Sequence, residues 1–208
     1  MGSIKGFSWN CGGLRRSAAS TYSKVMFFEK NFKNDFDFFF FLETHHKDEN
    51  EIPNELLRYE DTHHIIHSET DTHETHSGII GLIRKKYTLS ENEELIKGRI
   101  LRIKLSEQTS KESYNIAVVY FPTNTNITLE DMQLFVRKLR MDQEHNVNDI
   151  ILGDSNFIDH SKDKKNGLNA KDKLMNTVWI PFLEEMDMVD PLGSKTQYEK
   201  YCPSSVPE

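Results

Sequence analysis

The segment from Asn148 to Asn156 constrains the fold of this chain more than any other. A short, β-branched apolar run, 150–152, stops at a glycine and is followed by Asp154 and Asn156. Such a run favours a core strand over a helix, and residues two apart just past its end share a side while the chain stays extended. A carboxylate and a carboxamide held there suit hydrolysis, because one can orient or deprotonate water while the other fixes it. The same residues also suit an ordinary Asx turn, so this segment alone leaves both interpretations open.

Three apolar runs upstream also end in polar groups. The run 4–10 alternates loosely and precedes a Cys-Gly-Gly turn, and the run 36–42 is continuous and aromatic. The run 114–120 is followed by Phe-Pro, where proline prevents further ladder donation and closes the strand. Four strands are therefore expected to carry polar side chains at their ends: Asn10, Glu43, Tyr120 and the pair Asp154 and Asn156.

Five motifs follow one another along nearly the whole chain. They are Ser8–Leu14 (SWNCGGL), Leu42–His45 (LETH), His76–Leu82 (HSGIIGL), Val118–Pro122 (VVYFP) and Leu152–Asn156 (LGDSN). In this order they resemble the endonuclease/exonuclease/phosphatase superfamily, which includes deoxyribonuclease I, exonuclease III and the abasic-site endonucleases. Within it they are most similar to the endonuclease domains of non-LTR retrotransposons. Ser155 replaces the usual phenylalanine of the last motif, and the flanking acid and amide are intact.

The resemblance implies an α+β fold. It is a four-layer αββα sandwich, in which two mixed, mostly antiparallel sheets lie face to face with helices outside. Residues 1–208 would form a single domain of this type, and the length of 208 residues agrees with one domain. No internal repeat or long linker marks a second one.

The resemblance also implies a metal-dependent phosphodiesterase, here a DNA-nicking endonuclease derived from a retrotransposon. Glu43 would be the principal ligand of Mg²⁺ or Mn²⁺, with Asn10 beside it, since such ions prefer hard oxygen ligands. Asp154 would align or deprotonate the attacking water, Asn156 would hold that water and a phosphate oxygen, and Tyr120 would bond the phosphate. Taken singly, each residue also has a structural explanation as a core, turn or solvated strand-end residue.

Two further family motifs, a Ser-Arg-Ile-Asp-like strand and a Ser-Asp-His-like segment, do not occur before the sequence ends at Glu208. The resemblance therefore predicts a domain that is incomplete at its C-terminus and lacks the last strands. Loss of an acid–base or electrostatic group would lower the rate by about 10²–10⁴. A catalytically inactive fragment, or a nucleic-acid-binding remnant, is the resulting alternative.

Charge and cysteine content bear on partners and compartment. A net charge of −7 and a pI near 5.7 argue mildly against a broad basic DNA-binding face, although local groups such as Arg84–Lys86 can still line a phosphate backbone. DNA is the expected partner, and a downstream reverse transcriptase in a longer polyprotein is possible. Only Cys11 and Cys202 are present, which suits a reducing compartment. The longest apolar stretch, Phe38–Leu42, is too short for a membrane span and no secretory signal is visible, so an intracellular protein, nuclear or cytoplasmic, is expected.

Between the motifs the sequence predicts helices over 20–32, 128–139 and 170–188, the last interrupted near Pro181. Short strands are expected over 63–67, 79–83 and 100–105. Polar loops are expected over 106–113 and 159–169, the second next to the site.

Two alternatives change the chemistry. The first is a transition-metal site built from five histidines, because imidazole is a common zinc or copper ligand; these are His63, His64, His67, His73 and His76. Their neighbouring Thr, Asp and Glu residues equally suit a polar hairpin loop. The second keeps the fold and makes the chain a phosphatase or deadenylase, acting on an inositol phosphate, sphingomyelin or a poly(A) tail.

Overall fold

The computed structural model describes residues 4–14, 18–31, 36–71, 76–122, 127–141, 150–156 and 168–188. The chain divides into two compact units, which we describe separately. The first comprises residues 1–124 and 137–156 and contains both sheets; the second comprises 125–136 and 157–208.

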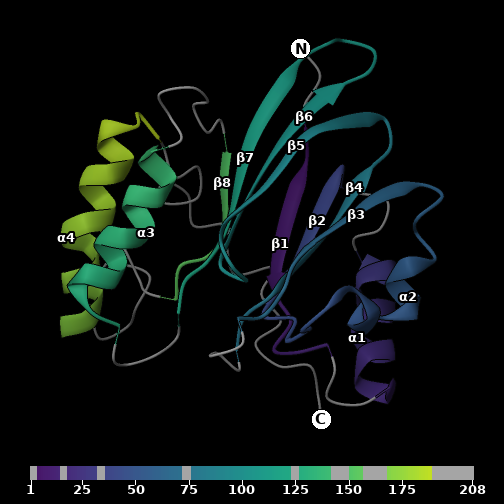
Figure 1. Cartoon of the computed structure of the whole chain (residues 1–208), viewed down its shortest axis with the longest axis horizontal. Helices are drawn as coiled ribbons and strands as arrows, with labels where there is room; N and C mark the ends of the chain where they lie inside the picture. The colour runs from purple at the N-terminus through teal and green to yellow at the C-terminus, as the bar shows by residue number, and fades with distance from the viewer. Residues whose placement is uncertain are drawn as a thin grey trace. The chain divides into compact units, whose positions relative to one another are not determined.

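The first sheet has four strands in the order β1-β2-β4-β3 (Figure 1). Strands β1 (Gly6–Asn10) and β2 (Phe38–Leu42) run parallel, with Asn10 opposite Leu42. Strand β4 (Ile79–Arg84) pairs antiparallel with β2 on one side and with β3 (His63–Ser68) on the other. The carboxyl ends of β1 and β2 therefore meet at one end of this sheet.

The second sheet has the order β5-β6-β7-β8. Strands β5 (Tyr87–Ile96), β6 (Ile100–Glu107) and β7 (Ser113–Tyr120) form an antiparallel meander, and β8 (Ile150–Asp154) pairs parallel with β7. Tyr120 lies opposite Asp154, so the carboxyl ends of β7 and β8 also meet. Each sheet thus has one parallel and two antiparallel pairs, which confirms the expected mixed, mostly antiparallel sheets of an α+β fold.

Strand β2 consists of five consecutive apolar residues because both of its faces are covered. Alternate side chains of a strand point to opposite faces, and all five are buried. Phe38, Phe40 and Leu42 pack into the core between the sheets, while Phe39 and Phe41 pack on the other face against helix α1 (Ala18–Asn31) and the short helix α2 (Asn54–Leu57). Figure 1 shows α1 and α2 together on that outer side of the first sheet. A continuous aromatic run is therefore the signature of a strand covered on both faces.

Most expected elements are confirmed, and the differences are local. Strand β5 was not predicted, and the expected loop 106–113 shrinks because β6 extends to Glu107 and β7 begins at Ser113. Helix α3 (Leu129–Met141) lies where a helix was expected, and a 3₁₀ turn (Glu49–Glu51) precedes α2. Most of the expected loop 159–169 lies outside the described residues.

Helix α4 (Ala170–Glu185) runs through Pro181 without a break, so the expected interruption there is wrong. A proline removes one intrahelical hydrogen bond, but the buried side chains on either side, Trp179 and Phe182, anchor the flanking turns. The helix begins with a capping box, in which Asn169 accepts from the backbone of Asp172 at 2.8 Å and donates back to its side chain at 3.0 Å. None of the described helices combines the length and apolar character needed to cross a membrane.

Candidate active site

Backbone pairing continues past the ends of β1 and β2 and builds the base of the site. Gly13 N–H donates to Glu43 O at 2.7 Å on one side. On the other side His45 N–H donates to Ser77 O at 2.9 Å. Glu43 and His45 both have positive φ, 57° and 62°, so the chain turns sharply between them. Three segments far apart in the sequence, around residues 11–14, 43–45 and 76–78, therefore lie side by side.

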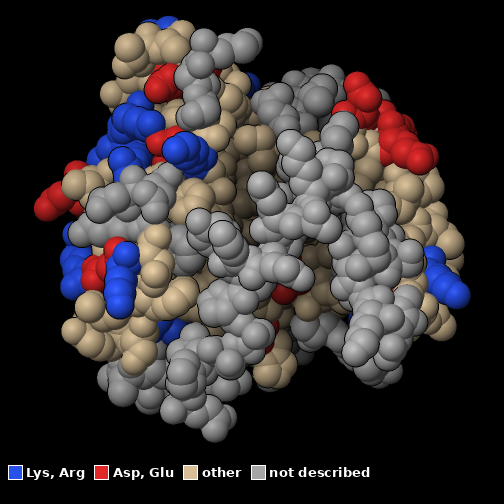
Figure 2. Space-filling view, turned by 180° about the vertical axis from the view of Figure 1, so that it is seen from behind, with Lys and Arg blue, Asp and Glu red and all other residues tan. Residues whose placement is uncertain are grey.

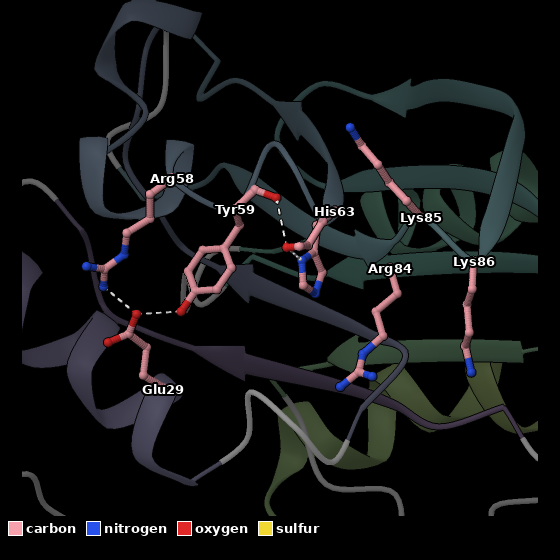
Figure 3. A pocket seen from close by; sticks show the side chains of 8 residues that line it. Glu29, Arg58, Tyr59, His63, Arg84, Lys85 and Lys86 are labelled. Carbon is pink, nitrogen blue, oxygen red and sulfur yellow. Dashed lines mark hydrogen bonds and ion pairs between the residues drawn. The ribbon is translucent and has the colours of Figure 1, made fainter.

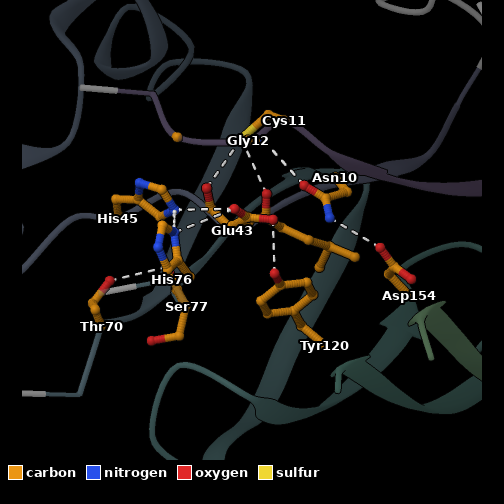
Figure 4. Close-up of polar contacts among 12 residues, drawn as sticks. Asn10, Cys11, Gly12, Glu43, His45, Thr70, His76, Ser77, Tyr120 and Asp154 are labelled. Atoms are coloured by element: carbon orange, nitrogen blue, oxygen red, sulfur yellow. Dashed lines mark hydrogen bonds and ion pairs between the residues drawn. The ribbon is translucent and has the colours of Figure 1, made fainter. Parts of the chain in front are cut away.

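The carboxylate of Glu43 is the centre of the site, as Figure 4 shows. Its Oε2 accepts a hydrogen bond from the Tyr120 hydroxyl at 2.7 Å. Its Oε1 lies 3.2 Å from His45 Nε2 and 3.7 Å from His76 Nδ1. One oxygen is thus tied to the second sheet, and the other faces two imidazole rings.

Asn10 lies between Glu43 and the acid at the end of β8 (Figure 4). Its Nδ2 donates to Asp154 Oδ2 at 2.9 Å, and its side chain also hydrogen-bonds to Glu43. Its Oδ1 accepts from Gly12 N–H at 3.0 Å, which fixes the amide orientation. Four of the five predicted site residues, from four different strand ends, therefore form one continuous network.

The fifth predicted residue, Asn156, lies beside Asp154. Its N–H donates to Asp154 Oδ1 at 2.9 Å, and its Nδ2 donates to Phe121 O at 2.5 Å. The first of these bonds closes an Asx turn at Asp154, the alternative that the sequence left open, and Asn156 itself has φ 54°, left-handed backbone that asparagine tolerates. Among the described residues nothing donates to the Asn156 Oδ1, so the turn and a catalytic role are compatible.

Gly153 is required for this arrangement. It has φ 151°, and a Cβ atom there would lie 1.7 Å from Val119 O on the neighbouring strand. A side chain would therefore separate β7 from β8 just before Asp154.

The charge state of the central carboxylate follows from its neighbours. Partial burial alone would raise the pKa of Glu43, but hydrogen bonds from Tyr120, Asn10 and His45 outweigh it and lower the pKa below its ordinary value of 4.5. Burial and the bond to Glu43 raise the pKa of Tyr120, so the phenol keeps its proton. Arg99 stacks on the Tyr120 ring at 4.8 Å and is itself buried. The site is therefore anionic at neutral pH and has a fixed donor.

His45 and His76 are functional candidates that the residue-by-residue prediction did not assign to this site. Both occur in the quoted motifs, LETH and HSGIIGL, so the signal was present. Their proximity depends on the positive φ of His45 and on its backbone bond to Ser77, and neither can be read from composition or spacing.

The other described histidines of the predicted cluster do not join them. His63, His64 and His67 lie on β3, where positions 63 and 67 are about 13 Å apart and neighbours point to opposite faces. His64 Nε2 lies 3.0 Å from Tyr87 O, and the His67 ring packs against His46 at 5.5 Å. The five-histidine site is therefore not formed by these residues; His73 lies outside the described residues.

A pocket of about 710 Å³ lies at the opposite end of the first sheet from Glu43. Figure 3 shows its basic and aromatic lining, in which Glu29 bonds to both Arg58 and Tyr59. Lys86 is similarly paired with Asp37 at 2.5 Å. These internal pairs neutralise much of the basic charge, and the pocket contains no converging catalytic set among the described residues.

Surface charge does not form a broad basic band on the face shown in Figure 2, where the described Lys and Arg side chains are interspersed with Asp and Glu. Two further basic clusters in the sequence, residues 15–16 and 162–165, lie outside the described residues.

Comparison with known proteins identifies the fold. A scan against protein-family models and a search of curated proteins found no match. Among solved structures, 99 chains match. They include the AP endonuclease LMAP from Leishmania major, with a TM-score of 0.63, 15% identity, and coverage of 90% of this chain and 68% of that one.

Two further structures extend this likeness. The 3′ phosphatase NExo from Neisseria, bound to a product DNA hairpin, has a TM-score of 0.63 and 12% identity over 88% of this chain and 71% of that one. The APE2 catalytic domain from Xenopus laevis has a TM-score of 0.56 and 16% identity over 86% and 67%. The chain therefore has the fold of the endonuclease/exonuclease/phosphatase superfamily, as its motifs predicted.

Proposed function

We propose that this chain is a divalent-metal-dependent phosphodiesterase that nicks DNA. The observation that carries the proposal is the network Glu43, Asn10 and Asp154, which places a lowered-pKa carboxylate and a second acid on either side of one amide. The likeness in fold to an AP endonuclease and to a phosphatase bound to DNA supports this chemistry and this substrate.

The donor set fits a hard divalent cation. Glu43 offers Oε1, and Asn10 Oδ1 keeps one lone pair after accepting from Gly12, so both supply the oxygen ligands that Mg²⁺ and Mn²⁺ prefer. When bound, such an ion would polarise the scissile phosphate and neutralise charge developing on its oxygens. The intrinsic anionic character of Glu43 at neutral pH favours this binding.

Asp154 is suited to act on the attacking water. Asn10 and the Asn156 backbone each donate to one of its oxygens, which fixes the carboxylate plane while lone pairs remain to accept a water proton. The Oδ1 of Asn156, to which no described residue donates, can accept a second bond from that water. The Tyr120 hydroxyl donates its proton to Glu43, so Tyr120 positions Glu43. To donate to the phosphate instead, the hydroxyl must first break this bond.

We further propose that the domain derives from a non-LTR retrotransposon, with a reverse transcriptase as its partner in a longer polyprotein. The support is the order of the five motifs and their residues, above all SWNCGGL and LETH. DNA carrying the target sequence of such an element would then be the natural substrate.

The test is nicking of supercoiled plasmid by the purified chain with Mg²⁺ or Mn²⁺. Glu43→Gln and Asp154→Asn keep side-chain shape and should each lower the nicking rate by about 10²–10⁴. Glu60→Gln replaces an exposed carboxylate in the turn that follows α2, and this matched control should leave the rate unchanged. Nicking that survives both active-site changes would locate the chemistry elsewhere, and a folded wild-type chain that binds DNA without cutting it would reduce the function to binding.

A second candidate is removal of a 3′ phosphate from DNA, favoured by the likeness to the Neisseria 3′ phosphatase. An oligonucleotide duplex with a 3′-phosphorylated nick distinguishes the two. Release of inorganic phosphate without strand scission would favour the phosphatase, and scission of intact plasmid would favour the endonuclease.

A further inference from the structure

Three ligand-type atoms converge on one side of the Glu43 carboxylate. Glu43 Oε1, His45 Nε2 and His76 Nδ1 are separated by 3.2, 3.4 and 3.7 Å. Among the described residues, this is the group of three or more His, Cys, Asp or Glu side chains that lies close enough to hold one metal ion.

The separations match the coordination sphere of a small tetrahedral ion. With metal–ligand bonds of about 2.0–2.1 Å, the ligand atoms around such an ion lie about 3.3–3.4 Å apart. The three observed distances differ from this by no more than about 0.4 Å. Small side-chain rotations are therefore enough to close the site.

The donor types select a class of ion. Two imidazoles with one carboxylate form the ligand set of zinc hydrolases that keep a fourth position open, whereas Mg²⁺ prefers oxygen ligands throughout. Glu43 Oε1 therefore has two imidazole nitrogens on one side, from His45 and His76, and the Asn10 amide oxygen on the other. The set favours a borderline transition ion over magnesium.

The fold holds these ligands in place. Tyr120 binds Glu43 Oε2 and so keeps Oε1 turned toward the two rings. Gly13 packs closely against His45, since a Cβ there would lie 2.7 Å from His45 Nδ1. The His45 to Ser77 backbone bond keeps His76 alongside, while the His76 side chain, 59% exposed, leaves an entry path from solvent.

We propose that Glu43, His45 and His76 bind a divalent transition-metal ion of the zinc and cobalt type, with a fourth coordination position open to water or to a phosphate oxygen. The site concerns ion binding alone and does not require the nuclease activity proposed above. This site and the proposed magnesium position share Glu43. A bound ion of the zinc and cobalt type would therefore replace magnesium there.

The test is titration of the full chain, freed of any histidine tag, with Co²⁺ followed by visible absorption, and with Zn²⁺ followed by calorimetry. We expect one equivalent of cobalt with the intense absorption of tetrahedral coordination, displaced by zinc. Loss of outer-shell partners costs 10–100-fold in affinity, so His76→Ala, which removes a direct ligand, should weaken binding by at least about 100-fold. His63→Ala, a histidine at the opposite end of the same sheet, is the matched control and should bind as the wild type does.

The proposal is overturned if the wild type takes up no stoichiometric cobalt, if its spectrum shows only weak octahedral bands, or if His76→Ala binds as tightly as the control. His45→Ala should weaken binding to a similar extent. Should that variant fail to fold, as judged by circular dichroism, His76→Ala still decides the question, because the His76 side chain is 59% exposed.

Discussion

Replacing Tyr120 with phenylalanine isolates the hydrogen bond that joins the second sheet to Glu43. The ring is fully buried and keeps its packing in the variant, so the hydroxyl is the only group removed. A hydrogen bond to a charged group contributes about 1.5–3 kcal/mol. The Glu43 side chain is 15% exposed and recovers part of this from solvent. We therefore expect a loss of about 1–2 kcal/mol in the free energy of unfolding at neutral pH.

The penalty should depend on pH. Tyr120 is one of the donors that hold the pKa of Glu43 below 4.5 in the folded protein. The stability that this hydrogen bond contributes is therefore present above the pKa of Glu43 in the unfolded chain and is lost as pH falls through its lower pKa in the folded protein. Acidification from neutral pH to about pH 3 should therefore shrink the difference between the variant and the wild type.

Urea denaturation at neutral and acid pH measures both effects. Tyr114→Phe is the matched control, because the Tyr114 hydroxyl also donates to a carboxylate, that of Glu112 at 2.8 Å, but at the surface, where little stability is lost. Equal destabilisation by the two substitutions, or a Tyr120→Phe penalty that does not change with pH, would refute the reasoning.

Three further predictions concern local features. Gly153→Ala places a Cβ against Val119 O and should lower the free energy of unfolding by about 2–6 kcal/mol. The control Gly12→Ala, at φ 58° with nothing within 4 Å of the added Cβ, should lower it by only about 1–2 kcal/mol, and thermal denaturation measures both. Burial raises the pKa of the Cys11 thiol to about 12, so peptide mapping after iodoacetamide treatment at neutral pH should find Cys11 unmodified until urea is added; rapid labelling of native protein would contradict its burial. Asn169→Ala removes the cap of α4 and should cost about 1 kcal/mol in unfolding free energy, while Asn169→Asp should preserve most of it.

The sequence predicted those parts of the fold in which local pattern and tertiary environment agree. The aromatic run of β2 is buried on both faces, so its composition alone marks a core strand. The parallel pairs β1–β2 and β7–β8 then account for the meeting of Asn10, Glu43, Tyr120 and Asp154, which the motifs anticipated.

The features that were missed depend on partners distant in sequence. Strand β5 is polar because it is an edge strand, and its Glu91 and Glu93 pair with Lys104 and Arg102 of β6 rather than with a hydrophobic core. The convergence of two histidines on Glu43 requires left-handed backbone that non-glycine residues seldom adopt, so no propensity could have indicated it.

The site is divided between the two sheets: Asn10 and Glu43 come from the first, and Tyr120 and Asp154 from the second. Two hydrogen bonds, Asn10 to Asp154 and Tyr120 to Glu43, cross from one sheet to the other. Apolar burial is non-directional, but a hydrogen bond of 2.7–2.9 Å is lost once the atoms separate by about 1 Å more. The proposed nuclease activity should therefore depend closely on how the two sheets are aligned, and core substitutions remote from the site should abolish it before they unfold the chain.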